Sequence, residues 1–250
     1  YKWFMVNVPD DLIRKYAKLL EKQKQFISAE KAQHDFLAYT KSIWLEFIEG
    51  RHHKIMADKF NQIATGEIKR LIVNMPPRHT KSEFASYLLP SWLMGKNPKL
   101  KIIQATHTGE LAVRFGRKVR NLMAQEDYKR IFPNAKLRPD SLAAGRWETD
   151  KGGEYFASGV GGAITGRGAD LMIIDDPHSE QDALSPTALE SAYEWYTSGP
   201  RQRLQPGGAI VIVMTRWSQI DLTGKLLKQQ GRDILADQWE VVEFPAIMPE

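Results

Sequence analysis

Short apolar runs alternate with helix-forming stretches over most of this chain, and that alternation is the feature that most constrains its fold. The runs lie at 71–73, 101–106, 171–174 and 209–214, with a fifth candidate at 240–244. Because most runs lack a polar residue at every second position, they are typical of strands buried on both faces of a parallel sheet. Helices are expected between them, at 82–94, 109–124 and 222–230. The sequence therefore predicts an α/β fold, a mainly parallel sheet flanked by helices and joined by right-handed crossovers.

Residues 1–60 follow a helical pattern instead. Apolar residues recur at helical spacing after Asp10 and Asp11, either of which is a suitable N-cap. A second amphipathic stretch, 36–48, is expected to end at Gly50, because glycine is favoured just past a helix C-terminus.

A third helix is expected over 54–64. The segment 138–168 is rich in glycine and serine, and we expect short strands and an irregular loop there. We interpret 1–60 as a helical segment that is part of, or packed on, an α/β domain formed by 61–250.

The composition excludes several classes of protein. A chain of 250 residues, 42% of them hydrophobic, can bury a sizeable core and is too apolar to be disordered. The absence of cysteine excludes disulfides, thiolate metal sites and a cysteine nucleophile. The longest apolar run is too short to cross a bilayer, and no secretory signal follows Tyr1. The net charge of +5 is a weak indication of a nucleic-acid partner.

The segment after the first strand is the richest in chemistry. A strand, a loop and a helix beginning at Lys81 and Ser82 form the layout of a phosphate-binding loop, in which backbone N–H groups and the positive helix end hold phosphates. The lysine meets the outer phosphates and the hydroxyl ligates Mg²⁺. The usual pattern has glycines where Met75 and Thr80 stand, so a polar turn before a helix is the alternative. The candidate nucleotide contacts are Pro77, Arg78, His79, Thr80, Lys81, Ser82 and Glu83.

A second motif follows the third apolar run, which ends in Asp175, Asp176 and Pro177. Buried strand residues would hold Asp175 rigidly at the carboxyl end of the strand, where a carboxylate can bind Mg²⁺ together with Ser82. Asp176 would orient or deprotonate the attacking water. An ordinary Asp-Asp-Pro turn is the alternative. Because both motifs occur in the right order, each after a buried strand, together they predict a P-loop nucleotidase.

Two further positions fit this prediction. Arg167 lies on a glycine-flanked loop just before the carboxylate strand and is a candidate arginine finger. A loop arginine that contacts solvent or DNA phosphate is equally compatible with the pattern. Thr215 ends the fourth run, where it is placed to sense the γ-phosphate, although an ordinary strand terminus is the alternative.

These motifs together resemble the large terminase subunit of tailed bacteriophages, and the likeness runs from about Phe36 to Pro249. The matching segments are 66–83, 105–108, 166–170, 174–178 and 214–217. The resemblance implies an ATPase of the additional-strand class that uses ATP and Mg²⁺ to drive double-stranded DNA into a procapsid. It also implies a homo-oligomeric ring, commonly a pentamer, docked on the portal protein, with a small terminase subunit that selects the DNA. Such a protein acts in the host cell cytoplasm during virion assembly and is neither secreted nor bound to membranes.

The resemblance also implies residue roles. Lys81 and Ser82 would be the phosphate and Mg²⁺ residues, and Asp175 the metal aspartate. Asp176 would be the catalytic carboxylate and Thr215 the coupling residue. In addition, Arg78 would be the arginine of the phosphate loop, and Arg167 would be the finger offered to a neighbouring subunit.

The chain departs from the family pattern at three points. Thr80 replaces the usual glycine, and Asp176 stands where many members carry glutamate, which is one methylene longer. Family members continue into a nuclease domain with a ribonuclease-H-like fold, whereas this sequence stops at Glu250, about where the linker would begin. We therefore expect no nuclease activity from these residues.

Two other functions remain open on the sequence alone. One is a helicase-like or other nucleic-acid-dependent ATPase with the same core. The other is a non-hydrolysing DNA-binding or assembly module whose phosphate loop has decayed, as the missing glycines would suggest.

Several other residues have weaker indications. Adjacent His52 and His53, like His34, do not have the spacing of zinc ligands. The stretch 34–54 is a candidate for contacting adenine, as the resemblance implies. A set of aromatic residues is interpreted as core and a set of basic ones as either a DNA-facing stripe or a solvated helix face. These sets are Trp44, Phe47 and Phe60, and Arg114, Arg117, Lys118 and Arg120.

Overall fold

A mixed sheet of eight strands forms the centre of the protein, whose computed structural model describes residues 10–164 and 166–246. The strands are β1 (Arg70–Asn74), β2 (Lys101–Thr106), β3 (Leu137–Ala143), β4 (Arg146–Thr149), β5 (Glu154–Gly159), β6 (Ala169–Asp175), β7 (Leu204–Met214) and β8 (Glu240–Glu243). Their order across the sheet is β3-β4-β5-β2-β6-β7-β1-β8. Among the strand pairs of the described residues, β3–β4 and β4–β5 alone are antiparallel. The predicted α/β class with a mainly parallel sheet is confirmed.

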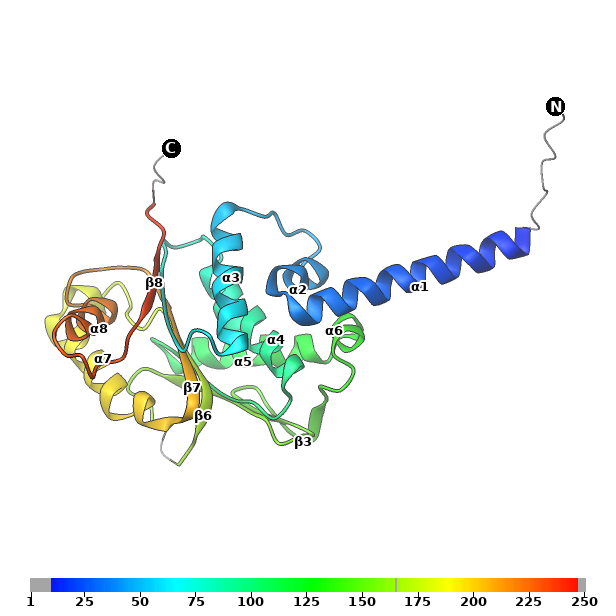
Figure 1. The fold of residues 1–250 in the computed structure, drawn as a ribbon. Coiled ribbons are helices and arrows are strands. Elements are labelled where there is room, and N and C mark those ends of the chain that lie inside the picture. The colour runs from blue at the N-terminus through cyan, green and yellow to red at the C-terminus, as the bar shows by residue number, and fades with distance from the viewer. Residues whose placement is uncertain (1–9, 165, 247–250) are drawn as a thin grey trace.

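Helices cover both faces of this sheet (Figure 1). The α-helices are α1 (Asp10–His34), α2 (Phe36–Ile43), α3 (Arg51–Thr65), α4 (Leu89–Lys96), α5 (Gly109–Met123), α6 (Glu126–Ile131), α7 (Pro186–Ser198) and α8 (Leu222–Gln230). A π-helix, η1 (Glu83–Leu88), and two short 3-10 helices, η2 (Asp182–Leu184) and η3 (Pro200–Arg203), complete the set. No helix in the described ranges is both long enough and apolar enough to cross a membrane.

The central strands β1, β2 and β6, and β7 from Ala209 onward, are buried on both faces, as their apolar runs predict, whereas β8 is largely exposed. In β1, Leu71 and Val73 join the core cluster that also contains residues of α2 to α6, and Ile72 between them joins the cluster that contains residues of α7 and α8. This alternation follows from the two-residue period of a strand. Figure 1 shows α7 and α8 on the opposite side of β6 and β7 from α3 and α4. The sheet is therefore sandwiched between two helical layers.

The N-terminal helices are integral to the larger core. Phe36 of α2 packs edge-on against Phe60 of α3, Phe84 of η1 and Trp92 of α4, with ring centroids 5.1–5.5 Å apart. Trp92 donates its indole N–H to the carbonyl of Ala32 near the end of α1, at 2.9 Å. The rest of α1 projects away from the body (Figure 1). Residues 10–60 thus contribute a helical layer to the sheet domain through the last turns of α1 and through α2 and α3.

The prediction of one helix over 36–48 is wrong. α2 ends at Ile43, and the next residue, Trp44, has φ −111° and ψ 89°. The segment 44–50 turns the chain so that Trp44 and Phe47 pack against the core cluster. Gly50 is therefore the N-cap of α3 and does not end the preceding helix.

The helix after the phosphate-loop candidate begins where the sequence predicts but is irregular. Its middle part is the π-helical η1, in which the N–H of Leu89 bonds to the carbonyl of Phe84. In a regular helix the ring of Pro90 would clash with the carbonyl of Ser86, and a wider turn before the proline relieves that clash. The helix then continues through α4 to Lys96, two residues beyond the predicted end at Met94.

Candidate functional site

The two predicted motifs meet at the carboxyl edge of the sheet. β1 and β6 both end there, on either side of β7. Ser82 Oγ donates to Asp175 Oδ1 at 2.9 Å, across 93 residues of sequence. Lys81 Nζ lies 2.8 Å from Asp176 Oδ2. The structure therefore brings a lysine, a serine hydroxyl and two carboxylates to one place, as the sequence predicts.

Asp175 is buried and fully hydrogen-bonded. Asp175 is the last residue of β6 and is 2% exposed. Its Oδ2 accepts from Ser86 Oγ at 2.6 Å, in addition to the bond that Oδ1 accepts from Ser82. Ser82 and Ser86 reach the same carboxylate because residues four apart share one face of a helix. Burial, followed by the nearby charge of Asp176, raises the pKa of Asp175 to about 7. A carboxylate in this setting is stabilised by a cation.

Asp176 connects the ends of two strands. Its backbone has φ +40°. Positive φ is uncommon outside glycine, although asparagine and aspartate adopt it more often than other residues. Oδ1 accepts the backbone N–H of Thr215 at 2.8 Å, while Oδ2 faces Lys81. The hydroxyl of Thr215 donates to the carbonyl of Met75 at 3.4 Å. The candidate coupling residue is thus bonded both to the candidate catalytic carboxylate and to the start of the loop.

The loop between β1 and η1 adopts glycine-like conformations without glycine. Arg78 has φ +64° and Thr80 has φ +66°, both in the left-handed region. His79 donates from Nδ1 to the carbonyl of Pro77 at 2.8 Å, and Pro77, Arg78 and His79 are exposed. The loop leads directly into a helix, whose first N–H groups and positive end favour anions.

The donor set fits Mg²⁺ bound together with a phosphate group. Ser82 and Asp175 offer a hydroxyl and a carboxylate, the hard oxygen ligands that Mg²⁺ prefers. Among the described residues there is no group of three or more histidine, aspartate or glutamate side chains placed to hold a metal alone. Mg²⁺ usually takes only one or two protein ligands and completes its shell with phosphate oxygens and water. The site therefore has the ligands expected for a metal carried in with a nucleotide.

Two of the predicted site residues lie away from this cluster. Arg167 bonds to Glu154, the first residue of β5, and its guanidinium lies 4.0 Å from the ring centroid of Phe156. It therefore sits toward the amino edge of the sheet, opposite the phosphate-loop candidate, and its neighbour Thr165 lies outside the described residues. Glu83 turns toward α5, where its carboxylate pairs with Lys118 Nζ at 2.7 Å.

The aromatic and basic residues with weaker indications lie in different surroundings. Phe60 is buried in the core, and Trp44 and Phe47 pack against it, which agrees with their interpretation as core residues. Two of the basic residues of α5 have partners within the chain: Lys118 is paired with Glu83, and Arg120 bonds to the carbonyl of Leu142. Arg114 and Arg117 are exposed.

Sequence reasoning missed three residues around the site. Ser86 is the second donor to Asp175, and its spacing from Ser82 was the available signal. Asp221 is fully buried and accepts from the N–H groups of Trp217 and Ser218. His53 reaches the loop from α3, with Nε2 2.6 Å from Thr80 Oγ1. A pair of adjacent histidines carried no signal of this contact.

Among known proteins, this chain is similar to solved structures. No family model matches the chain, and no curated protein matches it. It is similar to the large terminase of bacteriophage HK97, at 13% identity and a TM-score of 0.44, over 78% of this chain and 39% of that one. It is also similar to the large terminase of a thermophilic bacteriophage in complex with ADP, at 13% identity and a TM-score of 0.39, over 74% of this chain and 44% of that one. The chain thus spans less than half the length of either protein.

Proposed function

We propose that this chain is an ATPase that hydrolyses Mg²⁺-bound ATP at the carboxyl edge of its sheet. The observation that carries the proposal is the pairing of Lys81 with Asp176 and of Ser82 with Asp175, two contacts that join distant parts of the sequence. A lysine and a serine at a helix N-terminus, facing two carboxylates at a strand end, are the groups that phosphoryl transfer to water needs.

Binding of the triphosphate requires few side-chain movements. Lys81 is 5% exposed and pairs with Asp176, so its side chain already lies at the site. A phosphate that takes over Lys81 would release Asp176 from this pair. Arg78 and His79 are exposed. Together with the N–H groups of the loop, they would hold the phosphate oxygens.

Hydrolysis would then follow from the freed carboxylate. Asp176 orients a water molecule and accepts its proton as the water oxygen bonds to the γ-phosphorus, and the bond to the bridging oxygen breaks to release ADP and phosphate. Ser82 and Asp175 would hold Mg²⁺, which would supply positive charge to offset the negative charge that builds up on the phosphate oxygens. The N–H of Thr215 keeps the Asp176 side chain fixed during the reaction.

The motor role rests on the sequence resemblance. We propose that hydrolysis moves double-stranded DNA into a procapsid, with this chain forming a homo-oligomeric ring on a portal protein beside a small terminase subunit. Thr215 would pass the loss of the γ-phosphate from Asp176 to the segment after β7. Arg167 would serve the site of a neighbouring subunit, because within its own chain it lies toward the opposite edge of the sheet.

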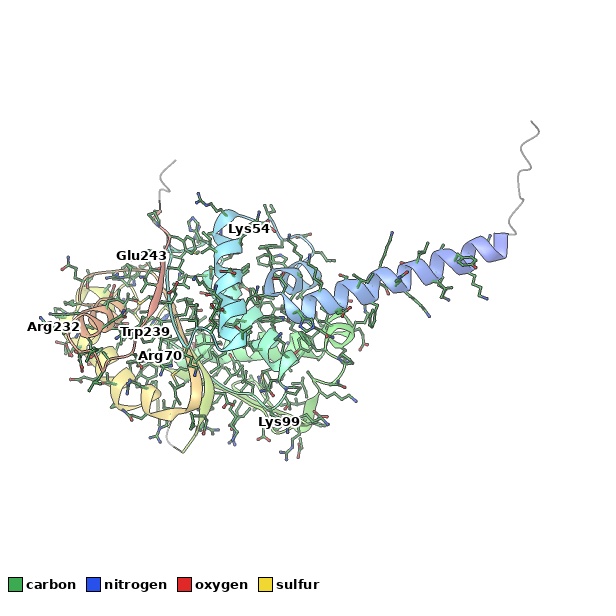
Figure 2. All side chains as sticks on the ribbon, in the orientation of Figure 1. Lys54, Arg70, Lys99, Arg232, Trp239 and Glu243 are labelled. Carbon is green, nitrogen blue, oxygen red and sulfur yellow. The ribbon has the colours of Figure 1, made fainter. Side chains whose placement is uncertain are left out.

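Turnover measurements on three proteins test the ATPase proposal. The wild type should release phosphate from ATP only with Mg²⁺ present, and Lys81→Ala should lower the rate by at least about 10²-fold, because the lysine stabilises the transferring group. Lys99→Ala removes an exposed lysine near the amino edge (Figure 2) and should leave the rate unchanged. Equal and negligible turnover in all three proteins would favour a non-hydrolysing assembly module instead.

The dependence of the rate on protein concentration tests the role of Arg167. If a neighbour completes each site, the specific rate should rise with concentration in the wild type and stay low in Arg167→Ala. A specific rate that is independent of concentration and insensitive to Arg167→Ala would remove the residue from the proposal. Strand separation in the absence of a procapsid would favour a helicase-like ATPase.

A further inference from the structure

Thr80 occupies a backbone conformation that its side chain disfavours. Its φ of +66° lies in the left-handed region, which glycine enters freely and β-branched residues rarely adopt. It immediately precedes Lys81, and its carbonyl accepts the N–H of Phe84 at 3.0 Å in the first turn of the following helix. The conformation of Thr80 therefore sets the direction in which the loop enters the helix and the position of the Lys81 backbone.

A chain of hydrogen bonds holds the Thr80 side chain. The backbone N–H of Gly50 donates to His53 Nδ1 at 2.9 Å, which leaves the proton of the neutral ring on Nε2. Nε2–H then donates to Thr80 Oγ1 at 2.6 Å. The Thr80 hydroxyl donates onward to the carbonyl of His79 at 2.5 Å. The three hydrogen bonds therefore run in one direction, from the Gly50 N–H through His53 and Thr80 to the carbonyl of His79.

The His53 ring is itself fixed. It is 5% exposed, stacks on Phe84 with centroids 4.9 Å apart at 28°, and meets Phe47 edge-on at 4.7 Å. Burial lowers the pKa of His53 to about 4, so that the neutral ring required by the hydrogen-bond chain is the form present near neutral pH. The next residue, Lys54, lies at the same end of the molecule as Glu243, the last residue of β8 (Figure 2).

We propose that His53 is a positioning residue of the phosphate loop: its Nε2–H holds Thr80 in the conformation that a glycine would adopt unaided, and so sets the loop N–H groups and Lys81 for phosphate. The inference rests on the proposed nucleotide site, and it adds the device that replaces the missing glycine. Among the residues of the described phosphate loop, His53 hydrogen-bonds only to Thr80, so its effect on a nucleotide passes through Thr80.

A four-protein cycle tests this role through Thr80. The proteins are the wild type, His53→Ala, Thr80→Gly and the double variant, and the quantity measured is the Kd of a fluorescent ADP analogue with Mg²⁺. His53→Ala should raise Kd about tenfold, the equivalent of one lost hydrogen bond. In the Thr80→Gly background the same change should alter Kd by less than about twofold, because glycine does not need the bond. Equal effects in both backgrounds would overturn the proposal.

Matched variants separate positioning from general damage. His53→Gln retains a side-chain N–H donor and should recover most of the lost affinity. Lys99→Ala removes an exposed side chain outside the candidate site and should leave Kd unchanged. If His53→Ala does not fold, Thr80→Ala tests the same bond from its other end and should give a similar loss. A Thr80→Ala protein with wild-type affinity would overturn the proposal.

A readout without nucleotide keeps this inference apart from the proposed function. Amide hydrogen exchange over 78–82 should be faster in His53→Ala than in the wild type, and His53→Gln should restore the wild-type rate. If the wild type does not bind the analogue, the proposed ATPase fails, while exchange still decides whether His53 holds the loop. Unchanged exchange in His53→Ala would overturn the inference even if the wild type binds nucleotide well.

Discussion

The backbone N–H of Thr215 donates to Oδ1 of Asp176 at 2.8 Å, so the end of β7 is bonded to the end of β6 through a side chain. The other oxygen of Asp176 faces Lys81 Nζ at 2.8 Å. One carboxylate therefore connects the phosphate-loop candidate to the segment after β7. In the proposed cycle, any group that draws Lys81 away leaves the carboxylate that accepts from Thr215 without its ion-pair partner.

Replacement of Asp176 by asparagine tests this carboxylate. Asparagine tolerates the left-handed backbone at this position and keeps an oxygen for the Thr215 N–H, so the fold should be retained. Turnover of ATP should fall by about 10²–10⁴-fold because no general base remains, whereas the Kd of an ATP analogue should change only a few-fold. Asp140→Asn, an exposed change on β3, should affect neither quantity. Wild-type turnover by the Asp176→Asn protein would exclude Asp176 as the base.

The pH dependence of stability tests the buried state of His53. Burial lowers its pKa to about 4 from 6.5, with His52 adding to the effect and Glu49 opposing it. The folded state therefore favours the neutral ring: its contribution is fully present above about pH 6.5 and is lost as the pH falls toward 4. Between pH 8 and pH 5 the wild type should lose about 1–2 kcal/mol more unfolding free energy than His53→Gln. Urea denaturation at both pH values measures this, and parallel losses in the two proteins would contradict it.

Replacement of Asp221 tests the segment after Thr215. Asp221 is fully buried, caps α8 by accepting from the N–H of Gly224, and pairs with Arg216 Nε at 3.0 Å. Asp221→Ala leaves these donors without a partner and should cost about 3 kcal/mol of unfolding free energy. Asp58→Ala, on the exposed face of α3, should stay within about 0.5 kcal/mol. A loss below about 1 kcal/mol in Asp221→Ala would show that the segment is not organised by this residue.

Two phenylalanines test whether the N-terminal helices belong to the main core. Phe36 is fully buried against rings from three other elements, whereas Phe26 on α1 is 70% exposed. Phe36→Ala should lower the unfolding free energy by about 3–5 kcal/mol in a single transition. Phe26→Ala should change it by less than about 0.5 kcal/mol. A separate early transition in Phe36→Ala would mean that α2 unfolds independently of the sheet.

The sequence predicts the sheet and the centre of the site well because strand position decides both. The apolar run before Asp175 requires a buried strand, and parallel strands that share an edge bring their carboxyl ends together. Topology alone therefore predicts that Lys81 and Asp175 lie near each other. Helix bounds such as Gly109–Met123 also follow from apolar periodicity.

The remaining features depend on contacts that periodicity does not encode. The helix expected through 36–48 stops because Trp44 and Phe47 pack on the core from a turn. Thr80 takes the glycine conformation because a distant histidine bonds to its hydroxyl. Arg167 is bonded to Glu154 toward the amino edge, a partner that its glycine-flanked loop gave no reason to expect. Each of these features is determined by tertiary contacts of one or two side chains.

A crystal structure of this chain with Mg²⁺ and a non-hydrolysable ATP analogue tests the central claim most directly. We predict Mg²⁺ about 2.0–2.1 Å from Ser82 Oγ, with Asp175 beside it, Lys81 Nζ moved from Asp176 onto the γ-phosphate, and Thr80 still in its left-handed conformation. Phosphates bound away from Lys81, or a metal bound without Ser82 and Asp175, would contradict the proposed site.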